Sequence, residues 1–449
     1  MKSINPYTGE VIYNHTPHSI TDVEKAIDYA HKAYLSWRKT SLSDRQNLML
    51  KLAEVLEENK RDWAKTMTLE MGKPMSQSLA EIKKCAWVCR YYATEAQKQL
   101  ADKFIETDAS KSYVTYEPLG VILGVMPWNY PFWQVFRFAV PTIIAGNTAL
   151  LKHASNVMQS AKNIQHAFEL AGFPKNVFTS LIIGSNKVEA IIRHPYVKGV
   201  SLTGSKPAGA EVASTAAQEI KPSLLELGGS NALVVFEDCD LDETVKICVN
   251  ARFQNTGQSC IAGKRLLVHE SIADIFLTQM TKATRELISG NTLDEKTYLG
   301  TMVSKQAAEE LNDQLQRSLE KGAEIVTGGN YNNAYFEPTI VKNVTKNMSI
   351  FKEETFGPLL SCTTFKTDEE AVALVNESEF GLGVSLFTNN LQRVEKLIPC
   401  FDEGAVFVNE LVKSDPRLPF GGTKISGYGR ELSVEGIKAF VNIKTVYIK

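Results

Sequence analysis

Apolar residues recur every three or four positions through the first hundred residues, which is the spacing of one face of a helix. Near the start of the chain this face comprises Val23, Ala26, Ile27, Ala30, Ala33, Tyr34 and Trp37, with Thr21 or Asp22 as its possible cap. A second long helical region ends at "MGKP", where Gly72 and Pro74 interrupt the pattern. We therefore predict that the N-terminal segment is mainly helical.

The pattern changes at residue 121, from which short apolar runs alternate with helical segments. "VILGVMP" and "TALLKHA" are runs of this kind, and "NVMQSAKNIQHAFELAG" has helical spacing. A second alternating region follows "LLELGGSNALVVFED". Such repetition predicts parallel sheets covered by helices on both faces. We expect two α/β domains that meet near residue 226.

Two segments outside these regions are rich in β-branched and aromatic residues: "KSYVTYEP" near residue 111 and "AFVNIKTVYIK" at the C-terminus. This composition is typical of strands. We expect them to pair with each other or with another subunit.

Composition excludes several classes of protein. At 449 residues the chain exceeds the size of a single core, so we expect more than one domain. A net charge of −2 leaves no surplus of positive charge to bind nucleic acid.

Residues 119–136 carry no charge, but Pro127, Asn129, Pro131 and Gln134 interrupt them, so we interpret them as buried core and not a membrane span. The N-terminus has no apolar region typical of a signal peptide. No CxxC pair occurs among seven cysteines, which favours a reducing cytoplasm without disulfides and predicts no metal site.

Three stretches carry candidate chemistry, and each also has a purely structural interpretation. Cys260 ends "QNTGQSC", where it is either a reactive thiolate or an inert buried residue. Asn129 in "PWNYP" could merely cap the following helix. Glu226 in "LELGGSN" could be a paired structural carboxylate.

The order of the motifs decides between these interpretations. "PWNYP", "SLTGSKPAG", "LELGGSN", "NTGQSC", "EETFGP" and "PFGGTKISGYGRE" follow one another as in one family. By these motifs the sequence resembles the aldehyde dehydrogenase superfamily, from "INPYTGE" to the C-terminus. The resemblance implies an α/β fold with a Rossmann-like NAD(P)-binding domain (1–102 and 121–225), an α/β catalytic domain (226–425) and a small β oligomerisation element (103–120 and 426–449). It also implies a homodimer or homotetramer.

The resemblance assigns three catalytic roles. Cys260 would attack the aldehyde, and Asn129 with the Cys260 backbone N–H would hold the oxyanion of the thiohemiacetal. Glu226 would activate the water that hydrolyses the thioester to a carboxylate.

It also assigns a cofactor site, although no GxGxxG fingerprint occurs in the chain. The residues expected there are Trp128, Lys152, Gly204, Ser205, Gly209, Glu354 and Phe356. NAD-preferring relatives often carry glutamate three residues after the lysine, where this chain has Ser155. A neutral hydroxyl beside Lys152 leaves room and positive charge for a 2′-phosphate. We therefore expect NADP to be accepted and preferred, with NAD as the other cofactor.

The substrate is predicted from a narrower resemblance, to short bacterial succinate-semialdehyde dehydrogenases. It rests on "PFWQVFRFAVP", "LKHASNVM" and "SDPRLPFGG". Arg137 is the only charge between residues 119 and 151, so it needs an anionic partner, either a substrate carboxylate or a protein carboxylate. Trp133 and Ser414 are placed in the same substrate pocket. The alternatives are a broad-specificity aldehyde dehydrogenase and, in a different class, a non-catalytic member such as a lens crystallin.

Overall fold

The computed structural model describes residues 1–449, and its first long helix illustrates how a few residues set where a helix begins. α1 (Ile20–Trp37) follows Ser19, whose hydroxyl accepts a hydrogen bond from the Asp22 N–H, while the Asp22 carboxylate accepts one from the Ser19 N–H. This reciprocal capping box satisfies two backbone donors of the first turn. The predicted cap at Thr21 or Asp22 is therefore wrong, because the cap is Ser19 and Asp22 is its inner partner.

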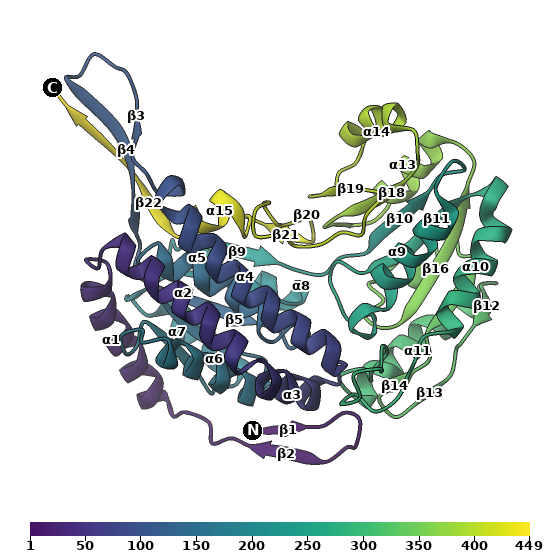
Figure 1. Ribbon diagram of the computed structural model, residues 1–449, viewed down its shortest axis with the longest axis horizontal. Helices are drawn as coiled ribbons and strands as arrows, with labels where there is room; N and C mark the ends of the chain where they lie inside the picture. The colour runs from purple at the N-terminus through teal and green to yellow at the C-terminus, as the bar shows by residue number, and fades with distance from the viewer.

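Three further helices complete the N-terminal segment: α2 (Leu42–Glu58), α3 (Lys60–Met71) and α4 (Met75–Gln99). α3 ends at Gly72, which has a φ of 79°, a left-handed conformation that favours glycine. The helix end predicted at "MGKP" is thus confirmed. The long helix α4 runs beside the first sheet (Figure 1) and carries Gln77, Glu81 and Lys84 at a spacing that places them on one face.

The first sheet has six strands in the order β21-β9-β8-β5-β6-β7, and all pairs except β21 with β9 are parallel. The strands are β5 (Val121–Met126), β6 (Thr148–His153), β7 (Phe178–Leu181), β8 (Val197–Thr203), β9 (Ser223–Glu226) and β21 (Gly427–Tyr428). The helices between them are α5 (Trp133–Ile144), α6 (Met158–Leu170), α7 (Val188–Arg193) and α8 (Lys206–Gln218).

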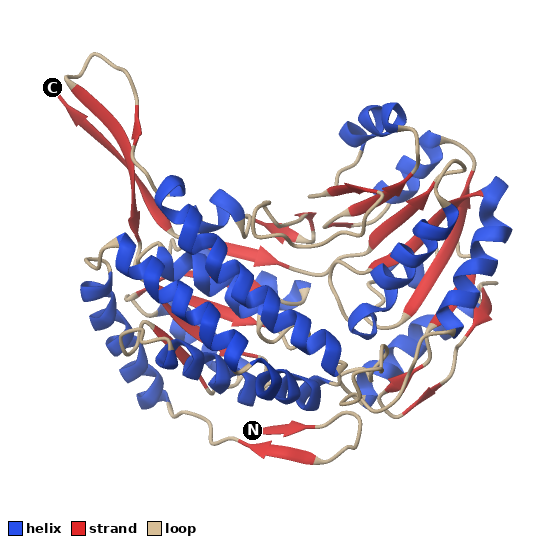
Figure 2. Ribbon diagram, in the orientation of Figure 1, coloured by secondary structure: helices blue, strands red, loops and turns tan.

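Helices cover both faces of this sheet, as Figure 2 shows. Ile122 of β5 packs in one apolar cluster with residues of α2, α4, α5 and α6. Its neighbours Val121 and Leu123 point the other way, into a cluster with residues of α1, α7 and α8. Successive residues of a strand therefore pack into two different cores. This explains why the strands are continuous apolar runs in the sequence.

The second sheet has seven strands in the order β12-β15-β16-β11-β10-β18-β19, parallel except for β12. The strands are β10 (Asn231–Val235), β11 (Gly263–His269), β12 (Glu324–Thr327), β15 (Thr339–Lys342), β16 (Leu359–Phe365), β18 (Val384–Phe387) and β19 (Val406–Val408). Its helices are α9 (Leu241–Phe253), α10 (Ala273–Arg285), α11 (Lys305–Leu319), α12 (Ser349–Lys352), α13 (Asp368–Asn376) and α14 (Leu391–Leu397). Two apolar clusters again pack on opposite faces.

A third, three-stranded sheet protrudes from the molecule near the C-terminus (Figure 1). It joins β22 (Val441–Ile448), β4 (Lys111–Pro118) and β3 (Lys103–Phe104), all antiparallel. The predicted pairing of the two isolated strands with each other is therefore confirmed, with Val441 opposite Pro118 and Ile448 opposite Lys111.

The remaining strands form short antiparallel pairs: β1 (Lys2–Ile4) with β2 (Val11–Asn14), β13 (Tyr331–Asn332) with β14 (Tyr335–Phe336), and β17 (Phe380–Gly381) with β20 (Thr423–Lys424). α15 (Ser433–Lys438) packs on α5 and α4. Because β21 joins the first sheet, only the end of segment 426–449 lies in the protruding sheet. The predicted α/β class is confirmed, whereas the domain boundaries stay a prediction. None of the helices is both long and apolar enough to cross a bilayer.

Candidate active site

Cys260 lies at the end of a tightly wound loop that follows α9. Asn255, Thr256 and Gly257 have φ values of 56°, 55° and 69°, all in the left-handed region. This conformation is strained for the β-branched threonine. At Gly257 a Cβ would lie 2.4 Å from the Gly357 carbonyl oxygen, so only glycine fits. Strain of this kind persists where surrounding contacts hold the backbone, and it is common at functional sites.

Buried amides supply those contacts. Asn255 Nδ2 donates to the carbonyl oxygens of Asn129 at 2.9 Å and of Gln258 at 3.0 Å. The Asn255 N–H donates to Gln77 Oε1 of α4 at 2.7 Å. The Gln258 side chain accepts from the Val303 N–H at 2.8 Å. The amides of "QNTGQSC" thus join the cysteine loop to "PWNYP" and to α4.

Lys264, at the start of β11, holds the other side of the loop. Its fully buried ammonium donates to the carbonyl oxygens of Ser259 at 2.8 Å and Cys260 at 3.0 Å, and to Glu354 Oε1 at 2.8 Å. Burial lowers the pKa of Lys264, and the Glu354 carboxylate opposes that shift. None of the sequence motifs had pointed to this residue. The signal was present, since "KRLLVH" brings two cations into a buried strand, where each needs acceptors.

Two hydrogen-bond donors remain available beside the cysteine. Asn129 is 3 % exposed, and its Nδ2 makes one hydrogen bond, to the Gln258 carbonyl oxygen at 3.1 Å. One amide hydrogen is therefore left over. The Cys260 N–H makes no hydrogen bond within the chain. A side-chain amide and a backbone N–H next to a thiol are the donors that an oxyanion needs.

The surroundings of Cys260 favour the protonated form of its thiol. Burial raises the pKa of Cys260 to about 11, although the Arg137 and Lys264 charges lower it. Reaction at neutral pH therefore needs proton removal or a further positive charge beside the sulfur.

Glu226, the last residue of β9, is 2 % exposed, and neither carboxylate oxygen makes a hydrogen bond. Burial raises the pKa of Glu226 well above its ordinary value, with Arg137 opposing and Glu431 reinforcing the shift. The side chain lines neither of the two pockets described below. It lies close enough to Cys260 for its charge to raise the pKa of the thiol. This effect is smaller than those of burial and Glu354, which also raise that pKa, and of Arg137 and Lys264, which lower it.

Arg137 of α5 is 2 % exposed and forms an ion pair with Glu431. The sequence left open whether the anionic partner of Arg137 is a substrate carboxylate or a protein carboxylate. In the structure a protein carboxylate, that of Glu431, is its partner. Its guanidinium also stacks on the Phe420 ring at 4.5 Å and lines the pocket that contains Cys260. Through its charge Arg137 lowers the pKa of both Cys260 and Glu226.

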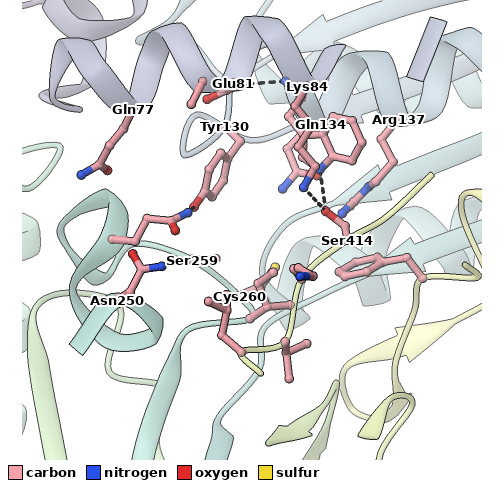
Figure 3. Close-up of a pocket in the computed structure, with 18 of the residues that line it drawn as sticks. Gln77, Glu81, Lys84, Tyr130, Gln134, Arg137, Asn250, Ser259, Cys260 and Ser414 are labelled. Carbon is pink, nitrogen blue, oxygen red and sulfur yellow. Dashed lines mark hydrogen bonds between the residues drawn. The ribbon is translucent and has the colours of Figure 1, made fainter. Parts of the chain in front are cut away.

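The larger of the two pockets at Cys260 has a volume of about 490 Å³ (Figure 3). Predicted substrate residues Trp133, Arg137 and Ser414 all line it. Lys84 of α4 also lines it, and sequence analysis missed this residue because "AEIKKCAW" reads as an ordinary exposed helical turn. In Figure 3 Lys84 and Arg137 come from the helices on one side of the pocket, and Cys260 lies on the other.

The second pocket, of about 220 Å³, reaches Cys260 from another direction. Its lining includes Asn129 and the predicted cofactor residues Trp128, Gly204, Ser205, Glu354 and Phe356. Ser205 precedes α8, whose first turn has no side-chain cap, so its backbone N–H groups are free for an anion such as a pyrophosphate.

Three predicted cofactor residues lie outside this pocket. Gly209 is buried in α8, where a Cβ would lie 2.7 Å from Leu227 Cδ2, so it allows close packing of the helix. Ser155 is exposed in the loop after β6. Lys152 is 9 % exposed and forms no ion pair or hydrogen bond, and burial lowers its pKa. An unpaired, largely buried ammonium near a neutral serine fits the hydroxyl and phosphate groups of a nucleotide.

Comparison with known proteins identifies the family. Residues 1–446 match the family model described as the aldehyde dehydrogenase family. The chain belongs to this family. The dehydrogenase is 45 % identical, over 99 % of both chains, to a probable NADP-dependent succinate-semialdehyde dehydrogenase of Synechocystis sp.. It is 42 % identical, again over 99 % of both chains, to an NADP-dependent succinate-semialdehyde dehydrogenase of Mycobacterium tuberculosis.

A solved structure agrees with this assignment. The crystal structure of a Streptococcus pyogenes succinic semialdehyde dehydrogenase in complex with NADP matches with a TM-score of 0.97 and 35 % identity, covering 100 % of this chain and 99 % of that one. The six sequence motifs therefore predicted the family correctly, and the chain is an aldehyde dehydrogenase.

Proposed function

We propose that this dehydrogenase oxidises succinate semialdehyde to succinate with NADP as the electron acceptor. The observation that carries the proposal is the position of Cys260, which lines two pockets at once. One has the apolar and cationic lining that a short aldehyde with a carboxylate requires. The other contains the residues expected to hold a nucleotide. The names of the relatives from Synechocystis and Mycobacterium support the same substrate and cofactor.

The chain's own residues account for every chemical step except the acceptance of the hydride. The Cys260 thiol loses its proton to solvent, the Sγ thiolate attacks the aldehyde carbon, and the oxyanion that forms accepts hydrogen bonds from Asn129 Nδ2 and the Cys260 N–H. Bound NADP would supply the hydride acceptor that converts the thiohemiacetal to a thioester. Glu226 takes a proton from the water that hydrolyses the thioester, and it must turn from Arg137 and Glu431 toward the sulfur to do so.

A panel of aldehydes tests the substrate. With NADP, we expect kcat/KM for succinate semialdehyde to exceed that for butanal by about tenfold or more, since a charge-assisted hydrogen bond contributes about 1.5–3 kcal/mol. Butanal has the same chain length without the carboxylate and is the matched control. Equal values for the two, or a higher value for benzaldehyde, would instead establish the broad-specificity alternative.

Ser155 tests the cofactor. We expect wild-type enzyme to prefer NADP, and Ser155→Glu to lose that preference by about tenfold or more in kcat/KM, because a carboxylate repels the 2′-phosphate. The matched control is Ser36→Glu, an exposed position on α1. Kinetics with both cofactors measure the ratio, and an unchanged ratio in Ser155→Glu would refute the assignment of Ser155.

We also propose a homodimer or homotetramer in a reducing cytoplasm. The protruding sheet exposes large apolar side chains, including Phe104 at 66 % and Ile443 at 63 %, which a partner chain would cover. All seven cysteines are free thiols, which fits a reducing compartment. Sedimentation velocity distinguishes these assemblies from a monomer, and a single-chain species at micromolar concentration would contradict the proposal.

A further inference from the structure

Lys84 is the one cation of the larger pocket whose charge no carboxylate of the chain balances. It forms no ion pair. Its two contacts are neutral: Nζ donates to Ser414 Oγ at 2.8 Å and lies 4.3 Å from the centre of the Trp133 ring. A largely buried ammonium without an anionic partner is costly, so an anion bound at this point would be stabilised by it.

The carboxylates nearest to Lys84 are already occupied by other partners. Glu81, one turn earlier on α4, pairs with Lys73 and accepts hydrogen bonds from the Phe132 and Trp133 N–H groups at 2.8 Å and 2.9 Å. Asp415 accepts two hydrogen bonds from the Arg417 guanidinium, at 2.8 Å and 2.6 Å.

The other charges that line the pocket are balanced in the same way. Glu410 pairs with Lys413, and Arg137 pairs with Glu431. The pocket therefore retains one net positive charge, located at Lys84.

Ser414 adds a second donor at the same point. Its Oγ accepts hydrogen bonds from Lys84 Nζ at 2.8 Å and from Trp133 Nε1 at 3.0 Å, and its own hydroxyl hydrogen has no acceptor. Figure 3 shows these two interactions meeting at Ser414, between the helices and the loop. The Ser414 O–H and the remaining N–H groups of Lys84 can therefore both donate to one bound carboxylate.

We propose that Lys84, with Ser414, binds the substrate carboxylate and determines the preference for an acidic aldehyde. This inference rests on the proposed function and deepens it. Arg137 lines the same pocket, where its charge is paired with Glu431 and lowers the pKa of Cys260 and Glu226.

The protonation of Lys84 gives the subsite a dependence on pH. Burial and, after it, the charge of Arg137 lower the pKa of Lys84 to about 8, although Cys85, Glu81 and Asp415 oppose the shift. The ammonium is therefore present below pH 8 and is lost as the pH rises above it. The KM for succinate semialdehyde should rise between pH 7 and pH 9, while the KM for butanal should not follow.

Lys84→Met tests the proposal against the matched control Lys83→Met, at the exposed neighbouring position. For Lys84→Met we expect the KM for succinate semialdehyde to rise about tenfold or more and the KM for butanal to change less than about twofold. Inhibition by the product succinate should weaken by a similar factor. Lys83→Met should behave as wild type. Lys84→Arg, which keeps the charge, should bind the acidic aldehyde without the rise in KM between pH 7 and pH 9.

Each other outcome overturns the proposal. If Lys84→Met changes the KM values for succinate semialdehyde and butanal equally, or changes neither, Lys84 does not bind the carboxylate. A melting curve shows whether Lys84→Met folds. If it does not, Lys84→Arg is the deciding variant: if its KM for succinate semialdehyde rises between pH 7 and pH 9 as in wild type, Lys84 is not the group that titrates. A wrong substrate assignment gives a different result from a wrong role of Lys84. In that case the wild-type enzyme itself would show no preference for succinate semialdehyde over butanal.

Discussion

The Glu226→Gln enzyme will release about one equivalent of NADPH per active site in a rapid burst and then turn over about 10² to 10⁴-fold more slowly than wild type. The amide cannot take a proton from water, so the thioester on Cys260 forms but is not hydrolysed. The charge-neutral replacement also suits the site, since burial raises the pKa of Glu226 well above its ordinary value. Stopped-flow absorbance of NADPH measures both phases.

The dependence of kcat on pH should report the titration of Glu226. Because the folded-state pKa of Glu226 is raised, the carboxyl is protonated at low pH and becomes a base only as the pH increases. Wild-type kcat should therefore rise with pH, and this rise should be absent in the steady state of Glu226→Gln. Glu10→Gln, at an exposed position, is the control. A loss of the burst itself would show that Glu226 acts before thioester formation.

The Cys260→Ser enzyme will lose activity by about 10⁴-fold or more, because removing a nucleophile eliminates the covalent route. In wild type, alkylation of Cys260 should be slow at pH 7 and accelerate toward pH 11, since burial raises the pKa of the thiol to about 11. Inactivation by iodoacetamide at a series of pH values measures this.

Cys400 offers the matched control, because it is the exposed cysteine of the chain. Cys400→Ser should retain wild-type activity and wild-type inactivation by iodoacetamide. Retained activity in Cys260→Ser, or inactivation that requires Cys400, would contradict the role given to Cys260.

The sequence predicted the parts of the fold that depend on local pattern. Apolar runs such as Val121–Met126 identify buried strands because consecutive residues feed two cores. The cap of α1 was predicted at the wrong residue. Asp22 takes part in the capping box from inside the helix, and its residue type is also common at the cap position itself, so the sequence alone does not distinguish the two.

The site was less accessible to prediction, because its chemistry depends on partners distant in sequence. Arg137 needs an anion, but nothing in the sequence identifies Glu431 as that anion. Lys84 has the pattern of an ordinary surface lysine, and although Lys264 lies in an apolar run, the sequence does not identify the acceptors that surround it. The left-handed conformation of Thr256 likewise depends on contacts from other segments and contradicts the residue's own preference.

The central claim is that an acidic aldehyde is oxidised on Cys260. The most direct test is to mix Glu226→Gln with succinate semialdehyde and NADP, quench with acid after the burst, and locate the acyl group by peptide mass spectrometry. The account predicts a succinyl thioester on Cys260 in proportion to the NADPH formed. A full burst with Cys260 unmodified, or with the succinyl group on another residue, would contradict it.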